Sequence, residues 1–378
     1  MRHLLTVLSF LSVLVMLTMG CSSRKDRELS EALADLDLAI AERPSREEKK
    51  LEYIQSLKLA CFRSPTYEQR VPLARQIVRE YFSYNLDSTR TWIAHWRDWA
   101  ETAKMENDVL WADLTQGEVL ANSGFYMEAY NILGKEMDVS RLPDEIAEAY
   151  FHALYRLADN IQENSLLEEG NFSIRHKTVY ADSLMTIYDR NSAEWRSMLV
   201  NKLMDQGAFV QARRENEILL DQLDPDSQDY ALAAFYESVL CDSLGLDAER
   251  MKWEIAAARA DFKNVQKNYA GLSLVATSLM ERDINRSFHY IQTALADAVF
   301  YNAKLRPWQI SHHLIIIQEA YERKMQESSR KLSIFTWARV LVTAMLIVAI
   351  VALASAFRKI TRPHREMEKV NQRLRDAN

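Results

Sequence analysis

Glycine and proline are scarce in this chain, which has eight glycines and seven prolines in 378 residues. Soluble proteins on average contain roughly 7% glycine and 5% proline. Phosphate-binding loops need backbone conformations that glycine supplies readily, so a nucleotide-binding loop is not expected, and no P-loop or Gly-x-Ser-x-Gly pattern occurs. The scarcity of helix-breaking residues predicts an all-α fold.

Cysteine and catalytic patterns are equally sparse. Cys61 and Cys241 lie far apart on apolar stretches, and they are expected to be buried small residues, although pairing in an oxidising compartment is the alternative. The eight histidines show no ligand spacing such as His-Glu-x-x-His. With a formal net charge of −6, the chain also offers no reason to expect nucleic-acid contacts. We therefore predict no catalytic, cofactor-binding or metal-binding residues and no enzymatic activity.

The N-terminus has the pattern of an export signal. Basic Arg2 precedes an apolar run from residue 4 to 19, and Gly20 and Cys21 follow. The segment around Cys21 is similar to a bacterial lipobox, in which the cysteine thiol receives a diacylglyceryl group. This predicts a signal peptide over residues 1–20 and lipidation of Cys21, with an unmodified signal peptide as the alternative.

A repeat occupies the middle of the chain. Gly124 is followed by an aromatic residue two positions on and an alanine five positions on, and Gly207 begins the same pattern. At a spacing of about 40 residues, this pattern resembles degenerate tetratricopeptide (TPR) repeats, in which glycine permits a tight turn and a small residue lets paired helices approach. An α-solenoid of helical hairpins is predicted over residues 21–306, including one pair near 143–160 and 171–190. The predicted turn and packing residues are Gly117, Gly124, Tyr126, Ala129, Gly207, Phe209, Ala212, Gly245 and Ala294.

Upstream of the repeat, helical spacing predicts a first hairpin from residues 47–61 and 71–84. Asp87 and Ser88 then offer an N-cap for the next helix. In that helix Trp92, Trp96 and Trp99 share one face. A buried seam between helices is the favoured interpretation, and a peptide-binding or carbohydrate-binding platform is the alternative.

The C-terminal part contains the longest apolar run. No glycine or proline occurs from residue 308 to 361, so we predict a connecting helix over 307–333 that continues into a transmembrane helix over 334–357. Trp337 and Arg339 are expected at the outer membrane interface, and Arg358 and Lys359 at the inner one.

The basic residues around this span predict its orientation. Seven lysines and arginines follow the span, against four in the segment just before it and Arg339 near its outer end, which places the C-terminal side in the cytoplasm. The expected product is a single-pass protein of a bacterial inner membrane, with residues 21–333 in the periplasm and 358–378 in the cytoplasm. Membrane lipid is thus an expected partner.

The basic tail after the span also shows a heptad-like pattern. Pro363 is predicted to end the helix, and Met367, Val370 and Leu374 then follow the a/d spacing of a coiled coil. A coiled coil would support a homodimer. The alternative is a basic helix lying on the lipid headgroups.

Several segments, above all residues 255–311 and 370–378, resemble an uncharacterised Bacteroidetes family of TPR-containing, membrane-anchored transcriptional regulators. The resemblance implies a periplasmic TPR sensor, one transmembrane helix, a short coiled coil and a cytoplasmic helix-turn-helix region. The sequence ends at Asn378, where that output region would begin, so the resemblance implies a truncated chain.

Together these features predict a signal-transducing membrane protein whose solenoid binds a protein or peptide partner. A scaffold lipoprotein that tethers partners without signalling is the main alternative. A glycan-binding lipoprotein would require exposed aromatic side chains such as Trp92 and Trp96.

Overall fold

The computed structural model describes residues 24–135, 137–164 and 172–376. The predicted signal peptide and Cys21 lie outside these residues. All regular structure in the described ranges is helical, as the scarcity of glycine and proline predicted, and no strand occurs among them. The chain divides into a first unit that ends at Ile317 and a second that begins at Gln318.

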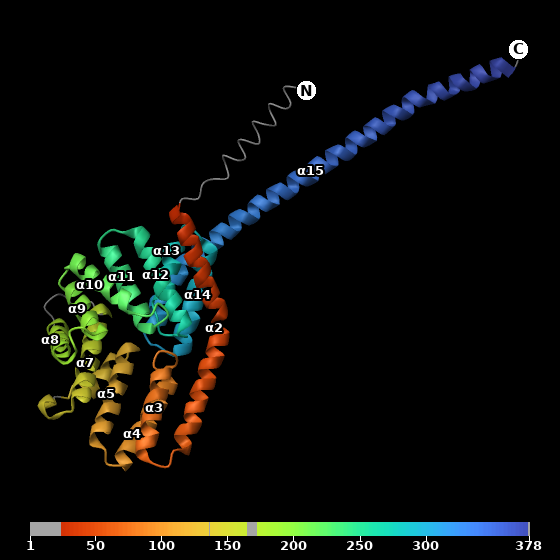
Figure 1. Cartoon of the computed structure of the whole chain (residues 1–378). Helices are drawn as coiled ribbons and strands as arrows, with labels where there is room; N and C mark the ends of the chain where they lie inside the picture. The colour runs from red at the N-terminus through yellow and green to blue at the C-terminus, as the bar shows by residue number, and fades with distance from the viewer. Residues whose placement is uncertain (1–23, 136, 165–171, 377–378) are drawn as a thin grey trace. The chain divides into compact units, whose positions relative to one another are not determined.

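The first unit contains helices that pack against their neighbours in chain order (Figure 1). Its elements are α2 (Arg24–Arg63), α3 (Tyr67–Tyr81), α4 (Leu86–Thr102), α5 (Glu106–Asn122), α6 (Tyr126–Leu133), η1 (Val139–Arg141), α7 (Asp144–Asn164), α8 (Phe172–Ile187), α9 (Ala193–Asp205), α10 (Phe209–Gln222), α11 (Gln228–Ser243), α12 (Asp247–Lys263), α13 (Gly271–Leu279), α14 (Ile284–Tyr301) and the first part of α15 (Arg306–Asp376).

Left-handed residues make the tight turns between these helices. Gly124, Gly207 and Gly245 have φ angles of 84°, 70° and 71°. In each turn the next residue donates its N–H to a carbonyl five positions back, as Phe125 does to Leu120 at 2.9 Å, which is the Schellman pattern that closes a helix end. Three further turns use Lys104, Val265 and Asn302 at φ angles of 59°, 56° and 69°, and no glycine marks them in the sequence.

The remaining predicted repeat residues lie where helices meet. Gly117 is inside α5 rather than in a turn, and a Cβ there would be 2.5 Å from the Leu133 side chain of α6. Ala129 and Ala212 are fully buried and Ala294 is 2% exposed, whereas Tyr126 and Phe209 are partly buried. These small residues therefore sit at close helix–helix contacts.

Helix α2 joins the two ends of the first unit. It is longer than the predicted helix over 47–61, and it packs on both α3 and α12 (Figure 1). Asp37 of α2 also accepts hydrogen bonds from Arg286 at 3.0 Å and from Tyr290, both on α14. The first helix of the solenoid is thereby held against its last repeats.

Two sequence predictions about helix ends were wrong. The N-cap of α4 is Asn85, whose side chain accepts the Ser88 N–H at 2.9 Å, because Leu86 already belongs to the helix. Pro363 does not end α15, which runs on to Asp376. A proline removes one backbone hydrogen bond and kinks a helix, and here strong helix formers such as Arg, Glu and Lys stand on both sides.

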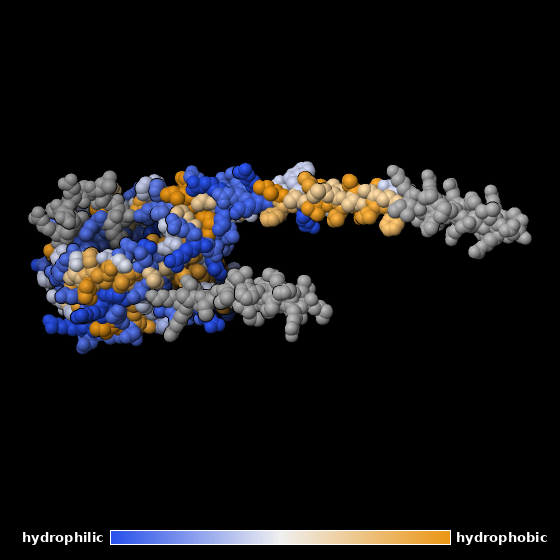
Figure 2. All heavy atoms as spheres, turned by 90° about the horizontal axis from the view of Figure 1, so that it is seen from above, coloured by the Kyte–Doolittle hydropathy of each residue, from blue (hydrophilic) through white to orange (hydrophobic). Residues whose placement is uncertain are grey.

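The second unit consists of the later part of α15. Arg306–Phe357 is the one helix among the described residues that is long and apolar enough to cross a membrane, and its apolar stretch is not buried against other protein. Leu332, Phe335 and Val348 are 69%, 68% and 67% exposed. Figure 2 shows this stretch as an apolar band on the face in view.

Lys104 offers a test of the turn geometry, because it is an exposed, non-glycine residue at a left-handed position. Lys104→Gly should stabilise the fold by up to about 1 kcal/mol, since glycine avoids the left-handed cost of roughly 1–2 kcal/mol but gives the unfolded chain more freedom. Lys104→Ala keeps the unfavourable φ and is the matched control. Thermal unfolding of the full chain in detergent would contradict the turn assignment if both variants shifted the midpoint equally.

Candidate ligand-binding site

Two adjoining cavities of about 280 Å³ each lie inside the solenoid, and together we call them the central cleft. The first lies between α5, α7, α9 and α11. The second extends towards α12, the loop of residues 264–270 and the start of α15. Pockets of this size, with a few polar groups among apolar ones, are typical ligand sites. Residues of the α3–α4 loop, α5, α7 and α11 line both cavities: Phe82, Asn122, Arg156, Gln228, Asp229, Leu232 and Tyr236.

Arg156 of α7 stands at the centre of the cleft and is held in place by neighbours. Its Nε donates to Asn122 Oδ1 at 3.3 Å, and its guanidinium also reaches Asp159 Oδ2 at 3.3 Å. Asp159 in turn pairs with Lys177 of α8 at 2.8 Å, and both residues are almost fully buried. Burial alone would lower the pKa of Arg156, but Asp159 more than offsets it and raises that pKa. Arg156 therefore stays charged.

Glu118 and His152 form a second polar pair on the wall of the cleft. Their carboxylate and Nδ1 atoms are 3.3 Å apart. Burial would raise the pKa of Glu118, but His152 and Arg156 outweigh burial and hold it below its ordinary value. The pair contributes a carboxylate whose charge is already partly balanced.

Tyr155 is the one side chain of the cleft whose buried polar atom has no hydrogen-bond partner in the described part of the chain. The residue is 1% exposed, it lines the first cavity, and its hydroxyl is unsatisfied. Burial and the nearby Asp159 raise its pKa well above the ordinary tyrosine value, so the hydroxyl keeps its proton. A buried hydroxyl without a partner costs free energy, which a bound ligand or water would recover.

Asp261 of α12 gives the second cavity an unusual carboxyl group. The residue is half-buried, and burial raises its pKa to about 8 although Arg306 acts in the opposite direction. Gly271 keeps the neighbouring backbone close, because a Cβ there would be 2.8 Å from the Ala258 nitrogen and 3.2 Å from Asp261 Oδ2. Near neutral pH this carboxyl is therefore largely protonated.

The loop of residues 264–270 closes one side of the cleft. Lys267 and Asn268 donate their backbone N–H groups to the Ser83 carbonyl at 2.8 and 3.1 Å. Behind the loop, the buried Asp297 of α14 accepts hydrogen bonds from Lys267 at 3.0 Å and Tyr269 at 2.5 Å, and also from Arg43 of α2. Turns that are far apart in the sequence are thus fixed against one another.

Helix α15 begins at the same place. The Lys304 N–H donates to the Ser123 carbonyl at 2.9 Å, and Leu305 packs so closely on Gly124 that a Cβ there would be 3.0 Å from the Leu305 Cβ. Arg306, the first residue of α15, lines the cleft. The cleft wall and the base of α15 therefore share residues.

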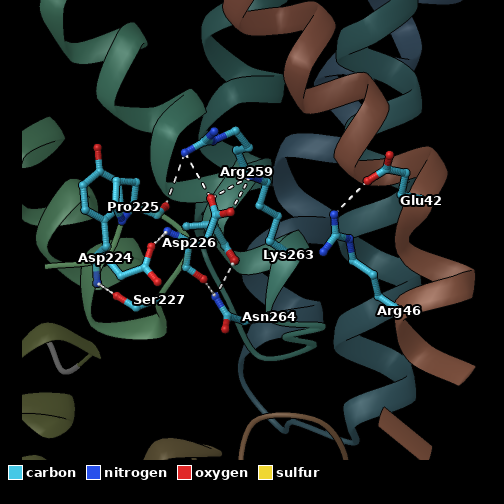
Figure 3. Close-up of polar contacts among 11 residues, drawn as sticks. Glu42, Arg46, Asp224, Pro225, Asp226, Ser227, Arg259, Lys263 and Asn264 are labelled. Atoms are coloured by element: carbon cyan, nitrogen blue, oxygen red, sulfur yellow. Dashed lines mark hydrogen bonds and ion pairs between the residues drawn. The ribbon is translucent and has the colours of Figure 1, made fainter. Parts of the chain in front are cut away.

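A polar cluster on the α10–α11 loop has its hydrogen bonds satisfied within the protein (Figure 3). Asp226 accepts from Lys263 at 2.6 and 2.7 Å, and its carbonyl accepts from Asn264 at 2.6 Å. Arg259 donates to the Pro225 carbonyl at 3.3 Å. These contacts fasten the loop to α12, which is a structural role.

The aromatic platform suggested by the sequence is not present. Trp92 and Trp96 are 5% and 2% exposed, so the favoured interpretation of a buried seam is confirmed. Arg75 covers the rings of Trp96 and Trp111 at 4.8 and 4.0 Å. Cys61 and Cys241 are both free and buried, so the alternative of a disulfide between them is wrong.

The other predicted site residues lie away from the cleft. Gly124 is next to its edge, whereas the remaining repeat residues sit in turns and helix contacts. Trp337 is 70% exposed on α15 and Arg339 is exposed as well. The side chains of Arg358, Lys359, Met367, Val370 and Leu374 lie outside the described part of the structure. The cleft residues themselves were not predicted, because no motif or regular spacing connects them.

Comparison with known families gives one match. The family model described as the SusR N-terminal TPR domain matches residues 40–312, which is more than half of the chain and includes every residue that lines the cleft. A comparison with curated proteins finds no match. A TPR domain of this kind indicates a role in protein interaction or sensing rather than catalysis.

The raised pKa of Asp261 predicts how stability depends on pH. An unfolded aspartate has a pKa near 3.9, so unfolding releases a proton between about pH 4 and 8, and rising pH favours the unfolded state in this range. Asp261→Asn removes this effect, so its unfolding temperature minus that of the wild type should grow by a few degrees from pH 5 to pH 8.

The matched control is Asp229→Asn, which removes an exposed carboxylate of the same cleft. Its difference from the wild type should change little over this range. Scanning fluorimetry on the full chain in detergent provides the measurement. A difference for Asp261→Asn that is independent of pH would contradict the assigned shift.

Proposed function

The chain belongs to the SusR N-terminal TPR domain family, and from this premise we propose that it is a membrane-anchored sensor. In this proposal the central cleft binds a protein or peptide partner, and binding is relayed across a bacterial inner membrane. The output would be a transcription-regulating region beyond this sequence. The observation that carries the proposal is that the cleft wall includes Arg306, the first residue of the helix that continues into the apolar segment.

The base of α15 supports coupling between binding and relay. Lys304 and Leu305 rest on the α5–α6 turn, and Arg306 faces the cleft. A partner that contacts Arg306, Asn268 or Asn122 touches residues that hold this base in place. A ligand shifts a conformational equilibrium only by its difference in affinity for the two states, and shared contacts provide such a difference.

The membrane arrangement is part of the proposal. The apolar side chains of the second unit are exposed to their surroundings on every side, which favours a lipid environment. We place residues 1–20 as a signal peptide, Cys21 as the lipid attachment point, 21–306 as the periplasmic TPR domain, 307–333 as the connecting helix and 334–357 as the membrane span. Trp337 and Arg339 then lie at the outer interface, and Arg358 and Lys359 at the cytoplasmic one.

The tail completes the proposed relay. Residues 358–378 would form a cytoplasmic basic segment in which Met367, Val370 and Leu374 mediate homodimerisation. Because α15 continues through Pro363, the heptad positions follow the membrane segment on the same helix, without the break that the sequence predicted. A change at the base of α15 could then reach an output region on the cytoplasmic side.

Inserting a flexible linker tests the relay. Six Gly-Ser residues placed between Ser328 and Ser329 of α15, in a chain fused after Asn378 to a reporter, should abolish the response to the partner and leave partner affinity unchanged. The same insertion between Pro65 and Thr66, in the exposed α2–α3 loop away from the cleft, is the control and should preserve both.

Reporter output and partner affinity would be measured in the same membranes. A response that survives the insertion in α15 would contradict the relay. If deletion of residues 363–378 also changed nothing, a scaffold that only tethers partners would be the better description.

A further inference from the structure

The balance of charge in the central cleft points to the kind of ligand it binds. We propose that the cleft selects a ligand carrying a primary ammonium group, which is received by Asp261 and Asp229 beside the rings of Phe235 and Tyr236. This proposal rests on the proposed function, because it names the chemistry of the partner that the cleft would sense.

Carboxylates outnumber cations along the two cavities. The lining includes two arginines, Arg156 and Arg306, and one histidine, His152, against five carboxylates: Glu118, Asp159, Glu194, Asp229 and Asp261. Lys177 offsets one of these charges through Asp159, and Asp261 becomes charged only as pH approaches 8, so the remaining excess of negative charge favours a cation over an anionic ligand.

Internal pairing leaves specific carboxylates available. Asp159 is bound by Arg156 and Lys177, and Glu118 is beside His152. Asp229 and Asp261 both line the second cavity, and no hydrogen bond or ion pair is found for either carboxylate among the described residues, although Arg306 of the same cavity acts electrostatically on Asp261. Asp229 is exposed at the mouth, whereas Asp261 is half-buried, so together they offer a carboxylate path from solvent to the interior.

A second observation, independent of the acidic residues, also indicates a ligand. Tyr155 is 1% exposed, and its unsatisfied hydroxyl belongs to the adjoining cavity. Phe235 and Tyr236 place rings in the second cavity, where an ammonium group gains electrostatic attraction from an aromatic face. The carboxylates and aromatic rings of the second cavity suit a cationic group, and the Tyr155 hydroxyl of the adjoining cavity suits a polar body attached to it.

The wider lining fits a peptide that carries such a group. Amide side chains of Asn122, Asn160, Gln228 and Asn268 line the second cavity. Each amide can both donate and accept a hydrogen bond, as a peptide backbone requires. The ammonium group itself could come from a peptide N-terminus or from a lysine side chain, and the two sources are separable by experiment.

The test uses three short peptides, each titrated into the full chain in detergent and followed by calorimetry. Trialanine amide has a free N-terminus, N-acetyl-Ala-Lys-Ala amide has only a lysine ammonium, and N-acetyl-trialanine amide has neither. At least one of the first two should bind at least tenfold more tightly than the third. Which one binds identifies the source of the ammonium group.

Variants connect the binding to the two aspartates. The double substitution Asp229→Asn with Asp261→Asn should lower affinity for the amine peptide at least tenfold. Asp98→Asn, an exposed carboxylate of α4 outside the cleft, is the control and should leave it unchanged. Thermal unfolding of each variant identifies any loss of fold.

The pH profile adds a readout that a purely structural role would not give. A lysine peptide should bind more tightly as pH rises from 6 to 8, because its ammonium stays charged while Asp261 loses a proton whose pKa is about 8. This increase should disappear in Asp261→Asn. The other charged or titratable groups that line this cavity, on α7, α11, the 264–270 loop and α15, are Arg156, Asp159, Asp229, Tyr236, Tyr269 and Arg306.

Three results would overturn the inference. They are equal affinity for the N-acetylated peptide without lysine, no saturable binding of either amine peptide at millimolar concentration, or unchanged affinity in the double variant. If a neutral oligosaccharide bound in the cleft and drove the reporter instead, the ammonium inference would fail while the sensing function stood. Amine binding without reporter output would leave the inference intact and contradict the relay.

Discussion

The buried carboxylate of Asp297 holds the first helix of the solenoid, α2, against its last repeats, and we call this arrangement closure. Asp297 is 2% exposed, and it receives hydrogen bonds from α2 through Arg43 and from the 264–270 loop through Lys267 and Tyr269. Loss of one partner of a buried ion pair typically costs about 3–5 kcal/mol, because the remaining charge is left without compensation. A chain of helical hairpins has no intrinsic reason to bring its ends together, and this cluster supplies one.

Closure has a local cost and creates the cleft. Val265, which begins the 264–270 loop, has a φ angle of 56°, a conformation that is unfavourable for a β-branched residue. The loop stays in place because Lys267 and Asn268 donate to Ser83 and because Val265 packs in the same core as Tyr301 and residues of α2 to α5. The strained loop thereby forms one wall of the cavity that holds Asp261 and also lies next to the base of α15.

The sequence predicted what depends on neighbours along the chain. Helical class, the α7–α8 pair and the glycine turns follow from composition and from spacing over a few residues. The turns at Lys104, Val265 and Asn302 could not be predicted from the sequence, because these residues are left-handed without being glycine. Tertiary contacts impose that conformation. The extra length of α2 escaped detection for a related reason, since its N-terminal half is covered by α12 and α14, which are more than 200 residues away.

The cleft could not be predicted for the same physical reason. Asn122, Arg156, Gln228 and Asp261 come from four helices, and only closure brings them to one cavity. Within its own helix, none of these residues differs in type or spacing from the other polar residues. Tyr155 illustrates the difficulty best, because an aromatic residue at helical spacing is expected in the core, and only its unsatisfied hydroxyl distinguishes it.

The second unit poses the opposite energetic problem from the first. Leaving a large apolar side chain in water rather than buried costs about 1.5–3 kcal/mol, and the stretch from Val340 to Phe357 presents such side chains at more than half exposure. No neighbouring protein in the described structure covers them. A lipid bilayer removes this cost without any protein contact. The two units thus differ in what they expose: the first buries charged groups such as Asp297 and Asp159, the second exposes its apolar side chains, and α15 runs from one unit into the other.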